Sequence, residues 1–308
     1  MRDMRDRVSL LMKESKGATI FDTWILFFVK IIYLGTKIPI LIIYGDNRRD
    51  RLDIWNFGRF LYKAIKFLGR GNPKLLKVHV PKYGYKFYCG VNNEDYIIMT
   101  RHEDEIIDRF SPKQGDIVVD IGAHMGRYTI ISSKRIGPHG KVIAIEAEPF
   151  NFEILSRNIK LNQLSNILAL NYAVYSKETR VKLYLPGRES GYTIFNTTIS
   201  NRSKSGQKFV EVRANTLDNL LQQNGITEVN WIKIDVEGAE FEVLKGAHNV
   251  LSKSKCIVLL IEVHGDPNVV KPKVQEFLSL YGFKLEFEKI YWTGSMHIFA
   301  RKSDSLTI

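Results

Sequence analysis

Residues 116–126 read DIVVDIGAHMG, and this stretch decides the fold class. The apolar run at 116–121 predicts a buried strand, and Gly122 and Gly126 predict a tight turn that leads into a helix. Glycines at such a turn let a ligand approach the backbone, and ligands often bind at the helix N-terminus that follows. The segment therefore predicts the first strand and the ligand-binding loop of an α/β domain.

The pattern of an apolar strand followed by a helix recurs along the chain. Further buried strands are predicted at 141–146, 167–171, 229–235 and 256–262. Helices are predicted at 150–162, from an N-cap at Thr216 to Asn224-Gly225, and at about 239–252. Alternating residues predict an antiparallel edge pair at 283–288 and 296–301. Short apolar strands that alternate with helices predict a doubly wound, mostly parallel sheet covered on both faces.

The glycine loop does not match a nicotinamide-cofactor fingerprint, because that pattern needs glycines where His124 and Arg127 stand. Asp120, just before the first glycine, would repel a pyrophosphate, but it would attract the cationic amino and sulfonium end of S-adenosylmethionine. Glu146 ends the second predicted strand, where an acid accepts hydrogen bonds from ribose hydroxyls in doubly wound folds. These features predict S-adenosylmethionine binding, whereas the neighbouring Glu148 is expected to be solvated.

A second group of chemically active residues is the stretch KIDVEGAE at 233–240, which ends the fourth predicted strand. Ligands of open parallel sheets bind at this edge. The carboxylates of Asp235, Glu237 and Glu240 would repel one another unless they are solvated, hydrogen-bonded or matched by a cation. Alternatively, Glu237 and Glu240 are first-turn carboxylates favoured by the helix dipole.

Glu262 and His264 lie on one face of the fifth predicted strand, because residues two apart in a strand point the same way. His264 is a candidate general base or metal ligand. Alternatively, His264 is a structural histidine whose ring nitrogens are satisfied by hydrogen bonds.

Five segments, taken in order, resemble the FkbM family of class I methyltransferases: VVDIGAHMGRYTIISS, IEAEPFNFEILSRNIKLN, ANTLDNLL, WIKIDVEGAEFEVLKGA and LLIEVH. The resemblance covers about residues 110–302. It implies a seven-stranded sheet of order 3-2-1-4-5-7-6, S-adenosylmethionine as methyl donor, and typically O-methylation of a sugar or another hydroxyl-bearing molecule. Many methyltransferases share the D-x-G-A-x-x-G element, whereas its combination with KIDVEGAE and EVH is more specific.

The resemblance assigns the donor site residue by residue. The donor's amino-acid end would be bound by Asp120, Gly122, Ala123 and Gly126. Its ribose would be bound by Glu146, and its adenine would lie at Tyr172 and Ala173.

The expected reaction is in-line transfer of the sulfonium methyl to a hydroxyl oxygen, for which positioning supplies much of the rate. A base must also take the hydroxyl proton, and Asp235 and then His264 are the candidates. A divalent cation held by Asp235, Glu237 and His264 is a possible alternative that the sequence does not favour.

These patterns divide the chain into three parts. Residues 1–74 are predicted to form an apolar and basic helical extension, 75–110 a hairpin and a helix, and 111–302 the methyltransferase domain. The hairpin turns at Pro81 to Gly84, and the helix at 94–110 ends before Ser111-Pro112. The polar loop 186–207 is long enough to be functional and is expected to help shape the acceptor pocket.

The N-terminal part is expected to contact an anionic membrane surface through residues 18–68. Residues 18–45 are apolar and long enough for a spanning helix, although Lys30, Lys37 and Pro39 count against one. Residues 50–68 predict a basic amphipathic helix of the kind that lies on membranes. Both helices could instead pack on the catalytic domain.

The net charge of +12 would suit a nucleic-acid partner, but its location in the apolar N-terminal part favours a membrane instead. Residues 1–90 hold 18 basic and 7 acidic residues, whereas residues 91–308 hold 27 and 26. The catalytic part therefore lacks the basic face of a nucleic-acid binder, which makes an RNA methyltransferase the less favoured alternative. A catalytically silent membrane-bound module is a further alternative, although Asp120, Glu146 and Asp235 argue against it.

The two cysteines, Cys89 and Cys256, form neither a metal-binding pair nor a disulfide framework. Cys256 opens an apolar run and is expected to be buried, as free cysteines often are. This cysteine usage suits a reducing, cytoplasmic setting.

Overall fold

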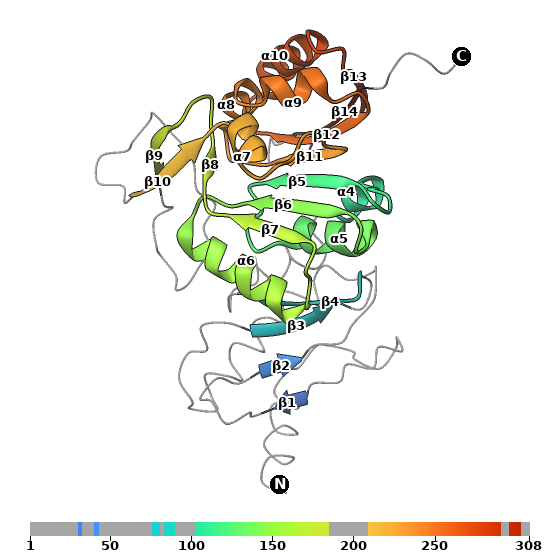
Figure 1. Cartoon of the computed structure of the whole chain (residues 1–308), viewed down its shortest axis with the longest axis vertical. Coiled ribbons are helices and arrows are strands. Elements are labelled where there is room, and N and C mark those ends of the chain that lie inside the picture. The colour runs from blue at the N-terminus through green and yellow to red at the C-terminus, as the bar shows by residue number, and fades with distance from the viewer. Residues whose placement is uncertain are drawn as a thin grey trace, which may run out of the picture.

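A seven-stranded sheet forms the centre of the protein, as seen in a computed structural model that describes residues 30–32, 40–42, 76–80, 83–89, 103–184, 209–290 and 296–302 (Figure 1). Its strand order is β13-β14-β12-β11-β5-β6-β7. The strands are β5 (Ile117–Ile121), β6 (Lys141–Ile145), β7 (Ile167–Leu170), β11 (Trp231–Ile234), β12 (Ile257–Val263), β13 (Lys284–Ile290) and β14 (Met296–Lys302). Only β14 runs antiparallel to its neighbours β12 and β13. The expected order 3-2-1-4-5-7-6 is confirmed.

Helices cover both faces of this sheet. On one face lie α4 (Asp104–Arg109), α5 (Arg127–Ile136) and α6 (Pro149–Leu161). On the other lie α7 (Leu217–Gln223), α8 (Glu240–Lys245), α9 (His248–Lys253) and α10 (Pro267–Ser279). Thr216 caps α7 as expected, because its hydroxyl accepts a hydrogen bond from the backbone N–H of Asn219 at 3.1 Å. The prediction of a helix at 94–110 is confirmed for α4, and residues 94–102 lie outside the described residues.

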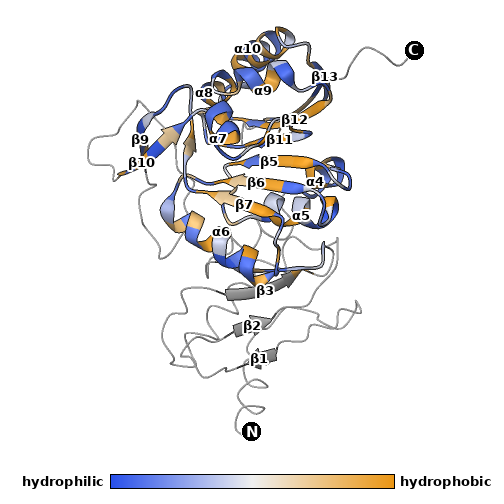
Figure 2. Cartoon of the chain, in the orientation of Figure 1, coloured by the Kyte–Doolittle hydropathy of each residue, from blue (hydrophilic) through white to orange (hydrophobic). Residues whose placement is uncertain are grey.

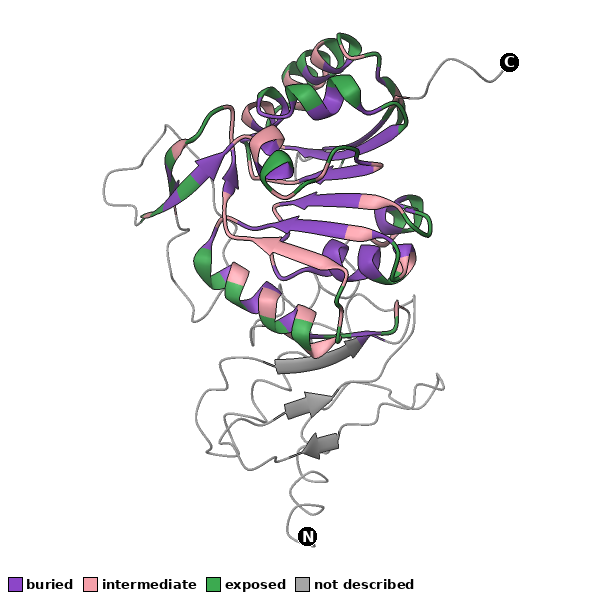
Figure 3. Cartoon of the chain, in the orientation of Figure 1, coloured by how far each residue is buried: buried purple, intermediate pink, exposed green. Residues whose placement is uncertain are grey.

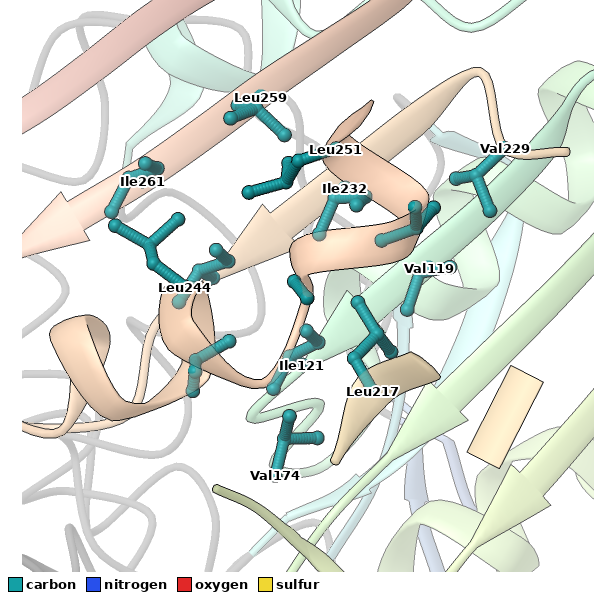
Figure 4. Packing of buried hydrophobic residues seen from close by; sticks show 14 of the residues in the cluster. Val119, Ile121, Val174, Leu217, Val229, Ile232, Leu244, Leu251, Leu259 and Ile261 are labelled. Carbon is teal, nitrogen blue, oxygen red and sulfur yellow. The ribbon is translucent and has the colours of Figure 1, made fainter. Parts of the chain in front are cut away.

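Alternation along the strands supplies both cores. Val118 packs toward α4 and α5, whereas the next residue, Val119, packs toward α7 and α9. Figure 4 shows the second core, in which Ile232 and Leu259 of the sheet meet Leu251 of α9. The central strands β5, β6, β11 and β12 are therefore mostly apolar (Figure 2) and mostly buried (Figure 3), whereas β7 and β13 at the two edges of the sheet are only partly buried.

The single helix expected at 239–252 is instead two helices, α8 and α9. Gly246 lies between them, and a Cβ atom at this position would come within 2.1 Å of the carbonyl oxygen of Tyr175. Close contact with another backbone segment therefore requires glycine here, and glycine weakens a continuous helix. The expectation of one helix is wrong for this local reason.

A small second sheet was not expected. It contains β8 (Ala173–Val174), β10 (Phe209–Asn215) and β9 (Thr179–Tyr184) in that order, and β10 is antiparallel to β9. It lies beside the carboxyl edge of the main sheet in Figure 1. The polar loop 186–207 lies between β9 and β10 in sequence and is outside the described residues.

The hairpin predicted from residue 75 is confirmed as β3 (Leu76–Val80) and β4 (Tyr85–Cys89). Asn158 of α6 and Asn162, the residue that caps the end of α6, bind the backbone of β4. Asn158 accepts a hydrogen bond from the backbone N–H of Tyr88 at 2.6 Å, and Asn162 accepts one from that of Lys86 at 2.8 Å. These two side chains, four residues apart, thus attach the hairpin to the end of α6.

The helix expected over residues 18–45 is wrong where the structure describes this segment. Residues Lys30–Ile32 form β1 and Ile40–Ile42 form β2, and the two strands pair antiparallel. β-Branched residues favour strands, and Gly35 and Pro39 between them disfavour a helix. The predicted amphipathic helix at 50–68 lies outside the described residues, and membrane contact stays a prediction.

Among the described residues, no helix combines the length and the apolar character that crossing a membrane would need. The expectation that Cys256 is buried is also wrong. This cysteine stands just before β12 and its side chain is exposed, because burial in this segment begins at Ile257.

Candidate active site

The glycine loop joins β5 to α5 and is held by backbone contacts on two sides. The N–H groups of Gly122 and Ala123 both donate to the carbonyl oxygen of Ile145, at 2.9 and 3.0 Å. Gly122 has φ +74, and a Cβ atom there would lie 1.8 Å from the carbonyl oxygen of Asp235. Gly126 has φ +95. Only glycine satisfies both requirements at position 122, the left-handed backbone and the close approach.

Asp120 is the penultimate residue of β5 and is almost fully buried. The hydroxyl of Thr129 donates to its Oδ2 at 2.5 Å, whereas Oδ1 has no hydrogen-bond partner among the described residues. Burial raises the pKa of this carboxyl, and the nearby ammonium of Lys233 opposes the rise. A buried carboxylate oxygen without a donor fits the expected role of Asp120, which is to bind the cationic end of the methyl donor.

Glu146 follows β6 and is buried against the glycine loop. Its Oε2 accepts from the backbone N–H of His124 at 2.7 Å, and its Oε1 accepts from that of Glu148 at 2.9 Å. Burial raises the pKa of Glu146 to about 7, although these backbone donors oppose the rise. Each oxygen keeps a further lone pair, so the carboxylate can still accept from ribose hydroxyls.

The expectation that Glu148 is solvated is wrong. Its side chain is buried and caps α6, because one oxygen accepts from the backbone N–H of Asn151 at 2.7 Å. Pro149 at the first helical position is the sequence signal that marks residue 148 as an N-cap.

Tyr172 and Ala173 lie at the same edge of the sheet as Glu146. Between them and β7, Asn171 donates its side-chain amide to the carbonyl oxygen of Glu146 at 2.8 Å. The guanidinium of Arg213 lies 4.6 Å from the centre of the Tyr172 ring, and Ala173 is buried at the start of β8. The structure therefore brings all the expected donor-binding residues to one edge.

The acidic residues after β11 gather around one imidazole. Nδ1 of His264 lies 2.8 Å from Oε1 of the buried Glu240, and Nε2 lies 3.4 Å from Oε2 of Glu237. Burial disfavours the charged imidazole, but the hydrogen bond with Glu240 and the charge of Glu237 raise the pKa of His264 to about 9. This shift favours the protonated imidazole, a form that cannot accept a proton.

Asp235 completes this cluster. Together with Glu237 and His264 it offers ligand atoms that all lie within 4.8 Å of one another, a set that suits a divalent cation. Its Oδ2 lies 3.0 Å from the Lys233 ammonium. Lys233 begins the KIDVEGAE stretch, but the sequence pattern predicted no role for it.

A neighbouring cluster was missed by sequence reasoning. Nε2 of His297 lies 3.1 Å from Oε1 of Glu103 and 3.4 Å from Oε2 of Glu262, and the hydroxyl of Tyr128 donates to Glu103 at 2.7 Å. Burial, followed by the charges of Asp235 and Glu103, raises the pKa of Glu262 to about 7. Since β14 pairs with β12, His297 stands opposite Glu262, and only this pairing identifies it.

Comparisons with known proteins agree with this arrangement. A model of the methyltransferase FkbM domain matches residues 120–285, which is more than half of the chain. Methyltransferase sdnD of Sordaria araneosa is 26% identical over 228 residues, covering 65% of this chain and 87% of that protein. The hexuronic acid methyltransferase AglP of Haloferax volcanii is 25% identical over 164 residues, covering 53% of this chain and 63% of that protein.

Among solved structures, an FkbM methyltransferase from Methylobacillus flagellatus superimposes with a TM-score of 0.43 at 17% identity. That overlap covers 60% of this chain and 43% of the other. The assignment rests on the family match, on the confirmed strand order and on the glycine loop between β5 and α5. The chain belongs to the FkbM family of class I S-adenosylmethionine-dependent methyltransferases.

Proposed function

We propose that this methyltransferase methylates a hydroxyl group of a sugar, a glycan or a lipid-linked glycan. The observation that carries the proposal is the contact between the two halves of the site, where the backbone of Gly122 packs directly on Asp235. A carboxylate next to the donor-binding loop is well placed to serve an acceptor hydroxyl there. S-adenosylmethionine, when bound, supplies the electrophilic methyl group.

In this proposal, some residues of the site bind the donor and another accepts the proton. Asp120 and Glu146 hold the donor by its cationic end and its ribose. Asp235 is partly exposed and takes the hydroxyl proton as the methyl group is transferred. Glu240 and Glu237 favour the protonated form of His264. The imidazolium would then stabilise the negative charge that develops on the acceptor oxygen, and it would not act as the base.

A divalent cation is the alternative way to activate the hydroxyl. Asp235, Glu237 and His264 have the ligand types and the spacing for it, and Glu240 would orient the imidazole from its other nitrogen. Chelation separates the two mechanisms. Activity that is lost with a chelator and restored by Mn²⁺ or Mg²⁺ supports the cation, whereas unchanged activity supports Asp235 as the base.

Two observations support a sugar as the acceptor class. Carboxylates at the acceptor side accept hydrogen bonds from neutral hydroxyl groups, and the described part of this cluster has several. One relative of this chain is named a hexuronic acid methyltransferase.

The test uses donor labelled in its methyl group and the full-length protein. Glycans, lipids and RNA from the source cells are offered separately as acceptors, and Asp235→Asn is the control protein. Label in a glycan or glycolipid fraction, together with an unmethylated form of it in cells that lack the gene, supports the proposal. Label in RNA alone overturns it, and donor binding without transfer to any fraction points to a silent module.

A further inference from the structure

Lys233 is a buried cation at the centre of the site that the proposed chemistry does not use. It lies on β11, opposite Asp120 of β5 in the strand register, and only 5% of its surface is exposed. Its ammonium group lies within ion-pair distance of the carboxylates of Asp235 and Asp120, which favour the charged form that lysine has at neutral pH. The chain therefore keeps a full positive charge inside its sheet.

The Lys233 ammonium contacts both halves of the site. It donates to Oδ2 of Asp235 at 3.0 Å and to the carbonyl oxygen of Gly122 at 3.2 Å. It also lies 3.9 Å from Oδ1 of Asp120 and 5.2 Å from the centre of the Tyr128 ring. One side chain thus joins the donor loop to the candidate base.

Stability alone is a poor reason for this arrangement. A buried ion pair is often no more stable than apolar residues of the same volume, because both charges must leave water. A buried ammonium that binds two carboxylates and a loop carbonyl instead restricts their positions. It also balances negative charge that would otherwise act on a cationic donor.

We propose that Lys233 is a positioning residue for methyl transfer: its ammonium fixes the glycine loop against Asp235 and balances the charge of Asp120 and Asp235. The role of Asp235 as base rests on the proposed function, whereas the effect of Lys233 on donor binding does not. Lys233 acts through these residues and is not itself a catalytic group.

The proposal predicts losses of different size for two ligands that differ in charge. S-adenosylmethionine carries a sulfonium charge, and its demethylated product S-adenosylhomocysteine does not. Lys233→Met should loosen the loop and weaken S-adenosylhomocysteine binding roughly tenfold, the usual effect of losing a hydrogen bond to a charged group. S-adenosylmethionine should lose less, because the carboxylates left unbalanced attract its charge.

Calorimetric titration of the full-length protein with both ligands measures this difference, and thermal unfolding is followed alongside. The control is Lys245→Met, which removes a half-exposed lysine paired with Glu242 and should leave both affinities unchanged. The double variant Lys233→Met/Asp235→Asn should lose less affinity than the two single changes combined, because Asp235 is then no longer left unpaired.

A folded Lys233→Met protein with both affinities unchanged, or with both weakened equally, overturns the proposal and leaves Lys233 a structural cation. If that variant does not fold, Lys233→Gln and the double variant carry the test, and wild-type binding in both overturns it. These titrations need no acceptor. A failure to find a methylated sugar would therefore contradict the proposed function without touching this inference.

Discussion

The two ends of the candidate active site, the proposed donor end and the proposed acceptor end, are built in different ways. At the donor end, which comprises Asp120, the loop 122–126 and Glu146, most contacts involve backbone groups. At the acceptor end, which comprises Asp235, Glu237, Glu240, Glu262 and His264, the contacts join side chains to side chains. The donor end is thus determined by local chain geometry that many sequences can share, and the acceptor end by a particular set of side chains.

The two ends meet where Gly122 packs on the carbonyl of Asp235, and Gly122→Ala should have the largest effect of the changes considered. The added methyl must displace backbone, and the left-handed φ adds strain, so we expect a loss of about 3–5 kcal/mol in the free energy of unfolding. Urea unfolding measures it.

Gly225→Ala is the matched control for this change. Gly225 has a similar φ of +67, but no atom lies within 4 Å of the position where a Cβ would stand. It should cost only about 1–2 kcal/mol, the strain of the left-handed backbone. Equal losses at both glycines would mean that the contact between the two ends contributes nothing.

At the acceptor end, Asp235→Asn should leave donor affinity nearly intact while it lowers turnover by ~10²-fold or more, the usual effect of removing a general base. Labelled-methyl transfer and donor titration measure the two quantities on the same preparation. Glu242→Gln is the control, since Glu242 contacts Ser176 and Lys245 outside this cluster. Turnover that survives in Asp235→Asn and resists a chelator would exclude both the base and the cation.

At the donor end, Asp120→Ala and Glu146→Ala should each weaken S-adenosylmethionine binding by about 1.5–3 kcal/mol, as expected for a lost hydrogen bond to a charged group. Calorimetry measures both affinities. The matched change Asp116→Ala removes a carboxylate just before the opposite end of β5, which accepts from the backbone N–H of Lys113. Wild-type affinity in both site variants would contradict the donor assignment.

Glu146 should also make donor binding depend on pH. Its pKa of about 7 means that the carboxyl becomes protonated as the pH falls below 7, and the protonated form accepts ribose hydroxyls less well. Donor affinity should therefore fall by up to about tenfold per pH unit below 7. In Glu146→Gln, calorimetric titrations from pH 5.5 to pH 8 should show a flatter profile, and a slope equal to that of the wild type would assign the effect to another group.

The sign for stability is the opposite. Because the folded pKa of Glu146 is raised, its favourable contribution to folding is present below its ordinary pKa and is lost as the pH rises through about 7. As the pH falls below 7, donor affinity should therefore decrease while the contribution of Glu146 to the stability of the donor-free protein increases.

The same contrast explains what could be predicted from the sequence. The positions of Asp120, Gly122 and Glu146 at one edge of the sheet could be predicted because they lie near the ends of adjoining strands and in one loop, and their role in donor binding stays a prediction. Glu103 and His297 were missed, since they meet Glu262 only after α4 and β14 pack beside β12. The helix expected at 18–45 was wrong where it can be compared, because apolar character was weighed above β-branching.

The last and smallest effect concerns the hydrogen bond between α6 and the glycine loop. Asn158 is fully buried on α6, and its side-chain amide donates to the carbonyl of Met125 in the glycine loop at 2.8 Å as well as binding β4. Asn162, one turn later, binds β4 through the backbone of Lys86, near the surface. Asn158→Ala should cost about 1–3 kcal/mol, since it leaves buried backbone groups unpaired.

Asn162→Ala is the matched partner, because it removes the same chemical group one turn further along, at the cap of α6, and that group also binds β4. It should cost about 0.5–1.5 kcal/mol, the net value of an ordinary hydrogen bond. Only Asn158→Ala should also weaken S-adenosylmethionine binding, by a few-fold, because only Asn158 contacts the loop. Urea unfolding and donor titration of both variants separate the two effects. If both variants bind the donor equally well, the hairpin supports the fold but not the loop, and the donor end depends on β5, β6 and β11 alone.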